Sequence, residues 1–398
     1  MKRRLKIFWQ KVLPIFLTLF SVTLLTVVSM LYAKGYRINI KDFKQIDNVN
    51  PSPSNIPISV SKNGILAVRS IPDAAKIYIN DELTETTNAT ISSLVPGDYN
   101  VKVKKEGFET WEKTIKVYED KVTDITALLV LKGGGLNPIT NTGVEQFELS
   151  NNGEMLSYVS KGEAKPGIYL IQLSNSPINI FQSQKKAIVV DGIYTYSNTE
   201  SIQWSPNDQE LLLKIDDNLF YVIDLNKPAN QIPTILTSTE LLFKDWEQKQ
   251  ILNKTSLADT LNMTEEEKAL AVSSNSVWSP DGDKFYIINK DEGTTDDYTV
   301  SVYNFEDPLP VSENKVNRAV KFEGLDTRVY WYSDSKHLLI VTKDKVKIVN
   351  IDGSNLFEVF SGEVIGAKAY PSPYGDRVII LSKFKTDGNA NLYGVSIR

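Results

Sequence analysis

The sequence predicts an all-β protein: a small antiparallel β-sandwich followed by a β-propeller, both preceded by one transmembrane α-helix. Three observations lead to this fold class. A four-residue turn motif recurs five times in the last two-thirds of the chain. Apolar and polar residues alternate strictly in short segments between residues 64 and 131, which is typical of half-buried strands. An uncharged run, Val12–Ala33, exceeds the ~20 residues that a bilayer crossing needs.

Composition excludes several classes of function. The 398 residues carry a net charge of −5, although residues 1–44 hold nine Lys or Arg and a single Asp, so the rest of the chain is acidic. An acidic body lacks the basic face that nucleic acid requires, so nucleic acid is not an expected partner. The chain has no Cys and one His, which excludes thiolate sites and any site that needs two imidazoles. No cofactor or metal is expected.

The uncharged run 12–33 predicts an uncleaved membrane anchor. Trp9 and Tyr32 flank it at the depths where aromatic side chains meet the membrane interface. A cleaved signal peptide is the alternative, but no small-x-small site ends the run, because Leu31 occupies the position two before Ala33. We therefore expect a basic cytoplasmic tail at residues 1–11, a single pass through the plasma membrane, and an extracytoplasmic body.

Residues 34–63 are expected to form a linker, because 45–63 are rich in Pro, Ser and Asn without apolar periodicity. Strands follow within residues 64–132. Tyr99–Val103 alternates apolar and polar side chains between a Pro-Gly-Asp turn and Gly107. Such a period of two, with one wet face, predicts a small antiparallel sandwich.

Residues 64–131 resemble the PEGA domain. The resemblance depends on Ser70-Ile71-Pro72, Ile77-Tyr78-Ile79-Asn80, Pro96-Gly97-Asp98-Tyr99, and Gly107-Phe108 followed by Trp111. Two positions depart from the family pattern: Asp81 stands where Gly is usual, and Thr90-Ile91 replaces Thr-Pro. The resemblance implies an extracytoplasmic module, often tethered to a membrane, with no catalytic residues.

The recurrent motif lies in residues 133–398. Its copies begin at Ser150, Ser205, Ser279, Ser333 and Ser372, and an apolar strand follows each. The Ser hydroxyl caps a tight turn, Pro presets φ, and Gly or Asp accepts the left-handed conformation. Repetition of such a unit favours propeller blades.

The segment from about 135 to 398 resembles the TolB-like propellers. Trp278-Ser279-Pro280-Asp281-Gly282 matches the family signature completely, and Trp204–Asp208 matches closely. Six blades are expected, with five or seven as alternatives. Residues 240–272 predict a helical insertion whose second helix starts with a capping box at Thr264. Either a degenerate sixth blade lies there, or residues 133–147 complete the last blade as a closing strand.

No catalytic, cofactor-binding or metal-binding residue is predicted, and the binding residues are left unspecified. The sequence has no G-x-S-x-G motif. Alignment of the turns by their Ser places His337 with Glu154, Gln209, Asp283 and Asp376, at an exposed turn position. Acidic pairs such as Asp216-Asp217 and Asp296-Asp297 are expected to be solvated surface, as are Glu265–Glu267. Asp281-Gly282-Asp283 lacks the spacing of an EF-hand.

The expected function is therefore that of a membrane-anchored binding scaffold of the bacterial cell envelope, with an envelope protein or glycan as its partner. Two alternatives stay open. One is a glycan- or peptide-processing enzyme with an acidic site, and the other is an envelope sensor or assembly factor. Neither the ligand nor the oligomeric state follows from the sequence.

Overall fold

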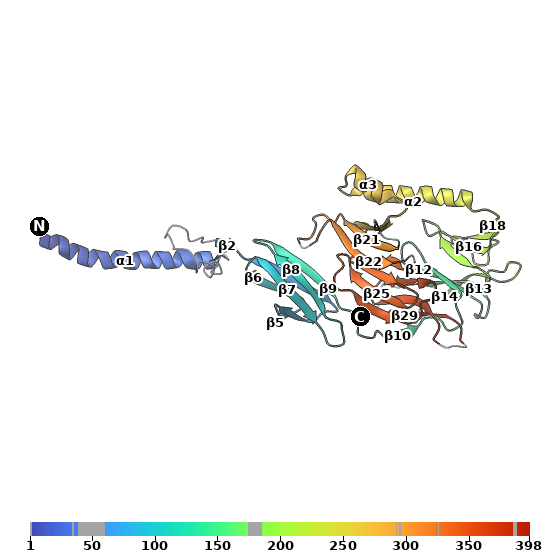
Figure 1. Ribbon diagram of the computed structural model, residues 1–398, viewed down its shortest axis with the longest axis horizontal. Coiled ribbons are helices and arrows are strands. Elements are labelled where there is room, and N and C mark those ends of the chain that lie inside the picture. The colour runs from blue at the N-terminus through green and yellow to red at the C-terminus, as the bar shows by residue number, and fades with distance from the viewer. Residues whose placement is uncertain are drawn as a thin grey trace. The chain divides into compact units, whose positions relative to one another are not determined.

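The computed structural model describes residues 2–33, 36–38, 60–173, 185–291, 293, 296–311, 313–324, 326–384 and 388–398. β-Strands are the commonest element among them, although they hold fewer than half of these residues (Figure 1). The chain divides into two compact units. The first comprises mainly residues 1–103 and 112–127, and the second mainly residues 104–111, 128–309 and 313–398.

The first unit begins with helix α1 (Lys2–Ala33). Its side chains are described between residues 15 and 30, and all of them are exposed. No helix among the described residues combines the length and the apolar character that a membrane crossing requires. Within the predicted linker 34–63, strand β1 (Tyr36–Ile38) pairs with β2 (Val60–Lys62), a hairpin-like sheet that the sequence did not indicate. The rest of the predicted linker, residues 39–59, lies outside the described residues.

The small β domain consists of two sheets, as expected for a sandwich, and the pairs β3–β6 and β4–β5 are antiparallel. One has the order β6-β3-β9 and the other β5-β4-β7-β8. The strands are β3 (Gly64–Ile71), β4 (Lys76–Ile79), β5 (Glu82–Thr86), β6 (Ala89–Leu94), β7 (Gly97–Lys104), β8 (Trp111–Val117) and β9 (Val122–Leu128). Alternation on β7 buries Val101 and Val103, while Lys102 between them is only half-buried. Asn80 and Asp81 join β4 to β5 with positive φ angles of 50° and 69°, the geometry of a two-residue hairpin turn.

The second unit contains five four-stranded antiparallel sheets among the described residues, whereas we expected six blades. Sheet 1 is β11 (Gln146–Leu149), β12 (Met155–Ser160), β13 (Gly167–Gln172) and β14 (Lys185–Val190). Sheet 2 is β15 (Ser201–Trp204), β16 (Glu210–Asp216), β17 (Leu219–Asp224) and β18 (Thr234–Leu236). Sheet 3 is β19 (Val277–Trp278), β20 (Lys284–Lys290), β21 (Asp297–Asn304) and β22 (Val316–Glu323). Sheet 4 is β23 (Arg328–Trp331), β24 (His337–Val341), β25 (Lys345–Asn350) and β26 (Phe357–Ser361).

Sheet 5 joins the two ends of the second unit. It takes β27 (Ala369–Pro371), β28 (Arg377–Ser382) and β29 (Asn391–Ser396) from the C-terminal end, and β10 (Leu136–Pro138) from the other. Leu136 lies opposite Val395 in the antiparallel pair of β10 and β29. Residues 133–147 thus supply a closing strand, which was one of the two predicted alternatives. Their use in sheet 5 explains why five sheets suffice.

Apolar clusters show the order in which the sheets pack. Sheet 2 shares a buried cluster with sheet 1, sheet 1 with sheet 5, sheet 5 with sheet 4, and sheet 4 with sheet 3. At the junction of sheets 1 and 2, for example, Ile168 of β13 and Ile202 of β15 belong to the same cluster. Each sheet therefore covers at least one face of its neighbour, which is how the inward side chains leave water.

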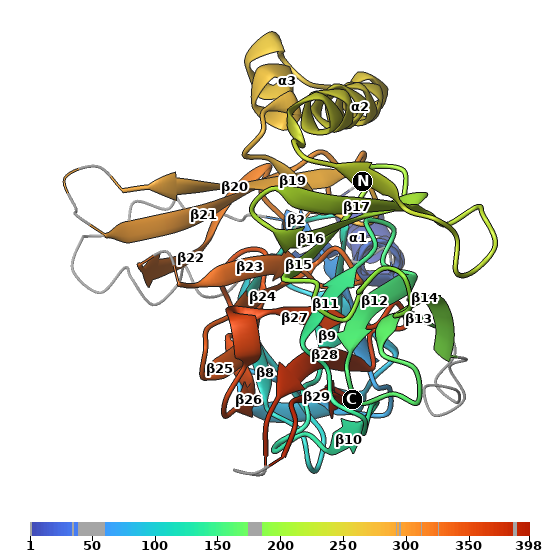
Figure 2. The same ribbon diagram turned by 90° about the vertical axis from the view of Figure 1, so that its right-hand side faces the viewer.

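Two helices, α2 (Glu240–Thr260) and α3 (Glu265–Val272), pack against the two sheets that this order leaves at its ends. Trp246 of α2 packs on Leu212 and Val222 of sheet 2. Further along, Ala258 of α2 and Ala271 of α3 pack on sheet 3. Both helices lie beside β19 in Figure 2 and fall inside the predicted insertion 240–272, and the predicted capping box at Thr264 is present.

If the closing sheet stabilises the second unit, a cavity in it should be costly. Leu392 of β29 is fully buried, so Leu392→Ala should lower the free energy of unfolding by about 2–5 kcal/mol. Leu356→Ala is the matched control, because its side chain is 50% exposed and the change should stay within ~0.5 kcal/mol. Urea unfolding of the full chain in detergent measures both values. Equal midpoints for the two variants would contradict the role of sheet 5.

Candidate functional site

The five turns share one backbone geometry, which aligns them. In each, the N–H of the first residue bonds to the carbonyl of the sixth, and the fourth residue has a φ angle between 56° and 77°. The first residues are Ser150, Ser205, Ser279, Tyr332 and Ser372. The fourth residues are Gly153, Asp208, Gly282, Ser335 and Gly375, the types that tolerate a left-handed backbone best. We call these segments, residues 150–154, 205–209, 279–283, 332–336 and 372–376, the turn face.

This alignment corrects the prediction for His337. The fourth copy begins at Tyr332 and not at Ser333, so His337 is the first residue of β24 rather than an exposed turn residue. Its structural equivalents include Lys284 and Arg377, which begin β20 and β28. Only 7% of His337 is exposed. The error arose because Ser333 offered a plausible Ser for the sequence alignment, whereas the backbone uses the tyrosine before it.

A tryptophan precedes three of the turns and links neighbouring elements. The indole N–H of Trp204 donates to the carbonyl of Glu148 in sheet 1 at 3.2 Å. Trp331 of sheet 4 donates in the same way to Val277 of sheet 3 at 2.9 Å. Trp278 of sheet 3 donates to Ala271 of α3, also at 2.9 Å. The carbonyl thus belongs to the first strand of the neighbouring sheet in two cases, β11 and β19, and to a helix in the third.

Side chains of the turn face also bond across sheets. The carboxylate of Asp208 in sheet 2 accepts from the backbone N–H groups of Asn151 and Asn152 in sheet 1, at 2.8 and 2.9 Å. The hydroxyl of Ser335 in sheet 4 accepts from the N–H of Asp281 in sheet 3 at 3.0 Å. The hydroxyl of Tyr332 donates to the Gly375 carbonyl in sheet 5. These bonds hold the turns of adjacent sheets in a fixed relation.

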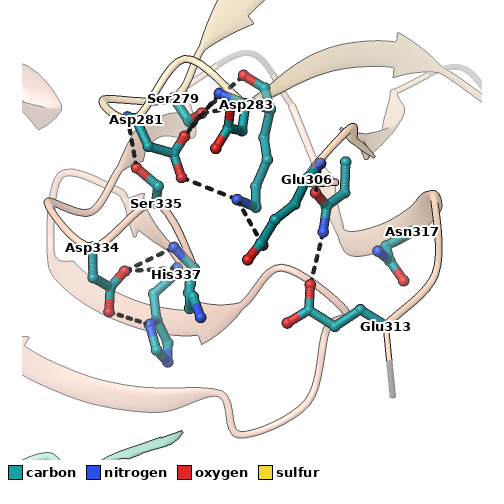
Figure 3. A network of polar contacts seen from close by, with 12 residues as sticks. Ser279, Asp281, Asp283, Glu306, Glu313, Asn317, Asp334, Ser335 and His337 are labelled. Atoms are coloured by element: carbon teal, nitrogen blue, oxygen red, sulfur yellow. Dashed lines mark hydrogen bonds and ion pairs between the residues drawn. The ribbon is translucent and has the colours of Figure 1, made fainter. Parts of the chain in front are cut away.

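A polar network that includes Asp281 and Glu306 (Figure 3) surrounds a buried lysine, Lys284. Lys284 is 1% exposed, and its Nζ lies 3.0 Å from Asp281 Oδ2 and 3.4 Å from Glu306 Oε2. Burial lowers the pKa of Lys284, but the hydrogen bond and charge of Asp281, helped by Glu306, raise the pKa above its ordinary value. The lysine is therefore a permanent cation that holds two carboxylates, and it is not a base.

His337 and Asp334 form a second pair in the same network (Figure 3). The ring Nδ1 of His337 lies 2.7 Å from Asp334 Oδ2, and the backbone N–H groups of Lys336 and His337 donate to Asp334 Oδ1. Burial raises the pKa of Asp334, but the imidazole and these N–H groups outweigh it and lower the pKa below its usual range. A His–Asp pair also orients catalytic histidines, but the structure records no hydrogen bond from this imidazole to a Ser hydroxyl among the described residues.

Glu148 of β11 is a third polar centre, which the sequence did not reveal. Its two oxygens accept from the Tyr370 hydroxyl and the Lys368 ammonium, both at 2.5 Å. Burial raises the pKa of Tyr370 well above its ordinary value, and that of nearby Tyr330 to about 12, so both phenols stay protonated. Both oxygens of Glu148 are occupied in joining sheet 1 to sheet 5, which explains the residue without a catalytic role.

The acidic residues considered from the sequence do not converge. Asp216 ends β16 and accepts from the N–H of Asn218, Asp297 begins β21, and Glu265 lies in the first turn of α3. Over the described ranges of the chain, no group of three or more His, Cys, Asp or Glu side chains is arranged to hold a metal ion. The polar networks of this unit lie instead among the turns of the five sheets, on the turn face.

Because the pKa of the Asp334 carboxylate is lowered in the folded chain, the free energy of unfolding should decrease at low pH. This pKa lies below the unfolded value of ~3.9, so the contribution of the carboxylate is present at neutral pH and is lost as the pH falls through the folded pKa. Asp334→Asn should cost about 1–2 kcal/mol at pH 7 and flatten the loss of stability below about pH 4. Urea midpoints between pH 2.5 and 7 test this, with Asp216→Asn as the control. An unchanged pH profile in Asp334→Asn would refute the pairing with His337.

Comparison with known proteins supports the first β domain. Residues 63–132 match the PEGA domain, as the resemblance of residues 64–131 indicated. The match covers this domain and not the chain as a whole. The sequence matches no curated protein.

Two solved structures are similar at a low level. TolB from Acinetobacter baumannii has a TM-score of 0.26 and 15% identity, over 75% of this chain and 60% of that chain. This chain therefore spans only about 60% of the TolB chain that it matches. A putative 6-phosphogluconolactonase from Bacteroides uniformis has a TM-score of 0.18 and 12% identity, over 70% of this chain and 72% of that one. At these TM-scores neither structure supports an argument about fold or function, and the TolB-like resemblance stays a prediction.

Proposed function

We propose that this chain is a membrane-anchored, extracytoplasmic binding protein of the bacterial cell envelope, without enzymatic activity. The observation that carries the proposal is the surface of α1. Eleven of the sixteen residues between 15 and 30 are large and apolar, and these side chains are 51–69% exposed. A continuous apolar surface of this kind is stable in water only when something covers it. A bilayer would cover it on all sides. The described side chains, residues 15–30, do not by themselves reach the length of a membrane span, so the proposed anchor, residues 12–33, also includes the uncharged sequence on either side of them.

The orientation of the anchor follows from charge. Residues 1–11 contain five Lys or Arg and no acid, against four Lys or Arg and one Asp in residues 34–44, and this small excess favours a cytoplasmic N-terminus. The acidic body would then lie outside. The PEGA match at residues 63–132 agrees with an extracytoplasmic domain close to the membrane.

The second unit would act as a five-bladed β-propeller with sheets 1 to 5 as blades. Three features support this architecture: the repeated four-stranded meander, the order in which the sheets share apolar clusters, and the pairing of β10 with β29. Radial repetition protects the sheet edges without a closed barrel. The turn face would be one end of this propeller.

Binding fits the turn face better than catalysis does. The ionisable groups that a hydrolase would need as acid or base hold the turns together: Lys284 with Asp281, and His337 with Asp334. The pKa of Lys284 is raised and the pKa values of Asp281 and Asp334 are lowered, so these three groups stay charged. A rigid face with exposed Asn, Asp and Lys tips is suited to recognise a protein or glycan over several blades.

Cysteine labelling tests the anchor and its orientation. The chain has no Cys, so a single introduced thiol gives no background. Ile193→Cys lies on the body and its native side chain is 96% exposed, whereas Lys6→Cys lies before the proposed anchor. In intact spheroplasts a membrane-impermeant maleimide should label Ile193→Cys and not Lys6→Cys. Labelling of Lys6→Cys alone would overturn the orientation, and recovery of the protein in the soluble fraction would overturn the anchor.

A sedimentation assay separates binding from turnover. Full-length protein in nanodiscs should be retained by insoluble cell-wall glycan and should release no soluble sugar or peptide from it. Retention should change little in Asp216→Ala or Asp297→Ala, because these carboxylates lie apart from the turn face. Release of soluble fragments, abolished by one carboxylate substitution such as Glu306→Gln, would show that the protein is an enzyme.

A further inference from the structure

Sheet 3 carries a polar pocket of about 360 Å³ away from the turn network. The pocket is lined by Asn289, Asp291, Thr299, Ser301, Arg318 and Lys321. All six side chains are polar or charged, in contrast to the mainly apolar lining of most small-molecule sites. A polar lining of this kind suits a ligand that is itself covered with hydrogen-bonding groups.

Strand pairing gathers these residues on one face of the sheet. Asn289 lies opposite Thr299, and Thr299 lies opposite Lys321, so one row crosses three strands. Ser301 and Arg318 form the next row. The same face carries Phe285 and Ile287 further along β20, where α2 and α3 cover it. The pocket thus lies on the polar part of this sheet 3 face, and the helices pack on the apolar part.

A β-bulge brings the two cations together. Residues three apart on a regular strand point to opposite faces, so Arg318 and Lys321 would not share a side of the sheet. The register shifts between Val300 and Ser301: Val300 pairs with Val320, but Ser301 pairs with Arg318. The extra residue, Ala319, turns Arg318 onto the face of Lys321. Bulges that re-aim a side chain in this way are common beside functional sites.

The charges of the pocket are only partly balanced. Asp291 accepts from Lys321 Nζ and from the Thr299 hydroxyl, both at 2.6 Å, so each of its oxygens is occupied. The hydrogen bond from Lys321, followed by that from Thr299, lowers the pKa of Asp291, so the carboxylate stays charged. Asp291 thus neutralises Lys321. The charge of Arg318 also helps to lower the pKa of Asp291, but in the described part of the chain no ion pair of this exposed guanidinium is recorded, and two cations against one carboxylate leave the pocket with one net positive charge.

We propose that this pocket binds a sugar that carries one anionic group. The guanidinium of Arg318 would take the anionic group in a forked pair of hydrogen bonds, which matches the planar geometry of a carboxylate or phosphate. Asn289 and Ser301, 3.4 Å apart, would bond to ring hydroxyls. The volume falls in the range of small-ligand sites. This site is separate from the turn face, so the inference goes beyond the proposed function and rests on it only for the envelope glycan as the source of the sugar.

The test uses the full-length protein in nanodiscs of uncharged lipid, titrated with glucuronate, glucose 6-phosphate, glucose and inorganic phosphate by calorimetry or ligand-observed NMR. Glucuronate or glucose 6-phosphate should bind at least tenfold more tightly than glucose, and the better of the two identifies the anionic group. Arg318→Gln should weaken that binding about 10- to 100-fold, since a hydrogen bond to a charged group is lost. Ser301→Ala should weaken it several-fold.

The matched control is Arg328→Gln, which removes an exposed arginine from β23 and should leave the affinity unchanged. Three results would overturn the proposal: equal binding of glucose and the anionic sugars, inorganic phosphate binding as tightly as glucose 6-phosphate, or wild-type affinity in Arg318→Gln. Each would leave the cysteine-labelling result untouched, so failure of the pocket is distinguishable from failure of the proposed location.

Discussion

The pairing of β10 with β29 is the constraint on which the second unit depends. Each of the five sheets has two faces and buries apolar side chains against a neighbour, so a row of sheets with free ends would leave apolar surface in water. Sheet 5 removes one free end, because β10, from the beginning of the unit, completes a sheet whose other strands come from its end. The remaining strands of sheet 5 then share buried clusters with sheets 1 and 4, on either side of it.

The helices α2 and α3 cover apolar surface at the other junction, between sheets 2 and 3. Sheets 2 and 3 lie at the two ends of the packing order, and α2 contacts both: Trp246 packs on sheet 2 and Ala258 on sheet 3. The hydrogen bond of Trp278 shows that a helix here takes the place of a neighbouring sheet. Its indole N–H donates to a carbonyl of α3, whereas the indoles of Trp204 and Trp331 donate to carbonyls of the adjacent sheet. The helices cover only the apolar part of the sheet 3 face. The polar pocket lies where this face is no longer apolar.

Much of this architecture is readable from local sequence, because a tight turn and an alternating strand are local events. The turns at Ser279 and Ser205, the hairpin at Asn80-Asp81 and the capping box at Thr264 all follow from a few neighbouring residues. The sequence does not predict strands β5 and β6, because their mainly polar side chains give no clear apolar period. They form by pairing with β4 and β3. The position of His337 required knowing which residue starts the turn, and the sequence offered Ser333 as well as Tyr332. The pocket could not be predicted from the sequence either. On a regular strand Arg318 and Lys321, three residues apart, point to opposite faces, and only the bulge brings them to the same face.

Sheet 5 also has a consequence for biogenesis. Its closing contacts join residues as far as 259 positions apart, so they add strongly to the contact order of the unit. Loop-closure entropy opposes such contacts until the rest of the unit is in place, which makes folding slow. Sheets 1 to 4 are complete in sequence before β29 is synthesised, and β10 must wait without its partner until the last residues of the chain emerge. If the body is exported as proposed, the unit cannot finish folding before β29 has been exported, and its partly built form exposes an unpaired strand throughout that time.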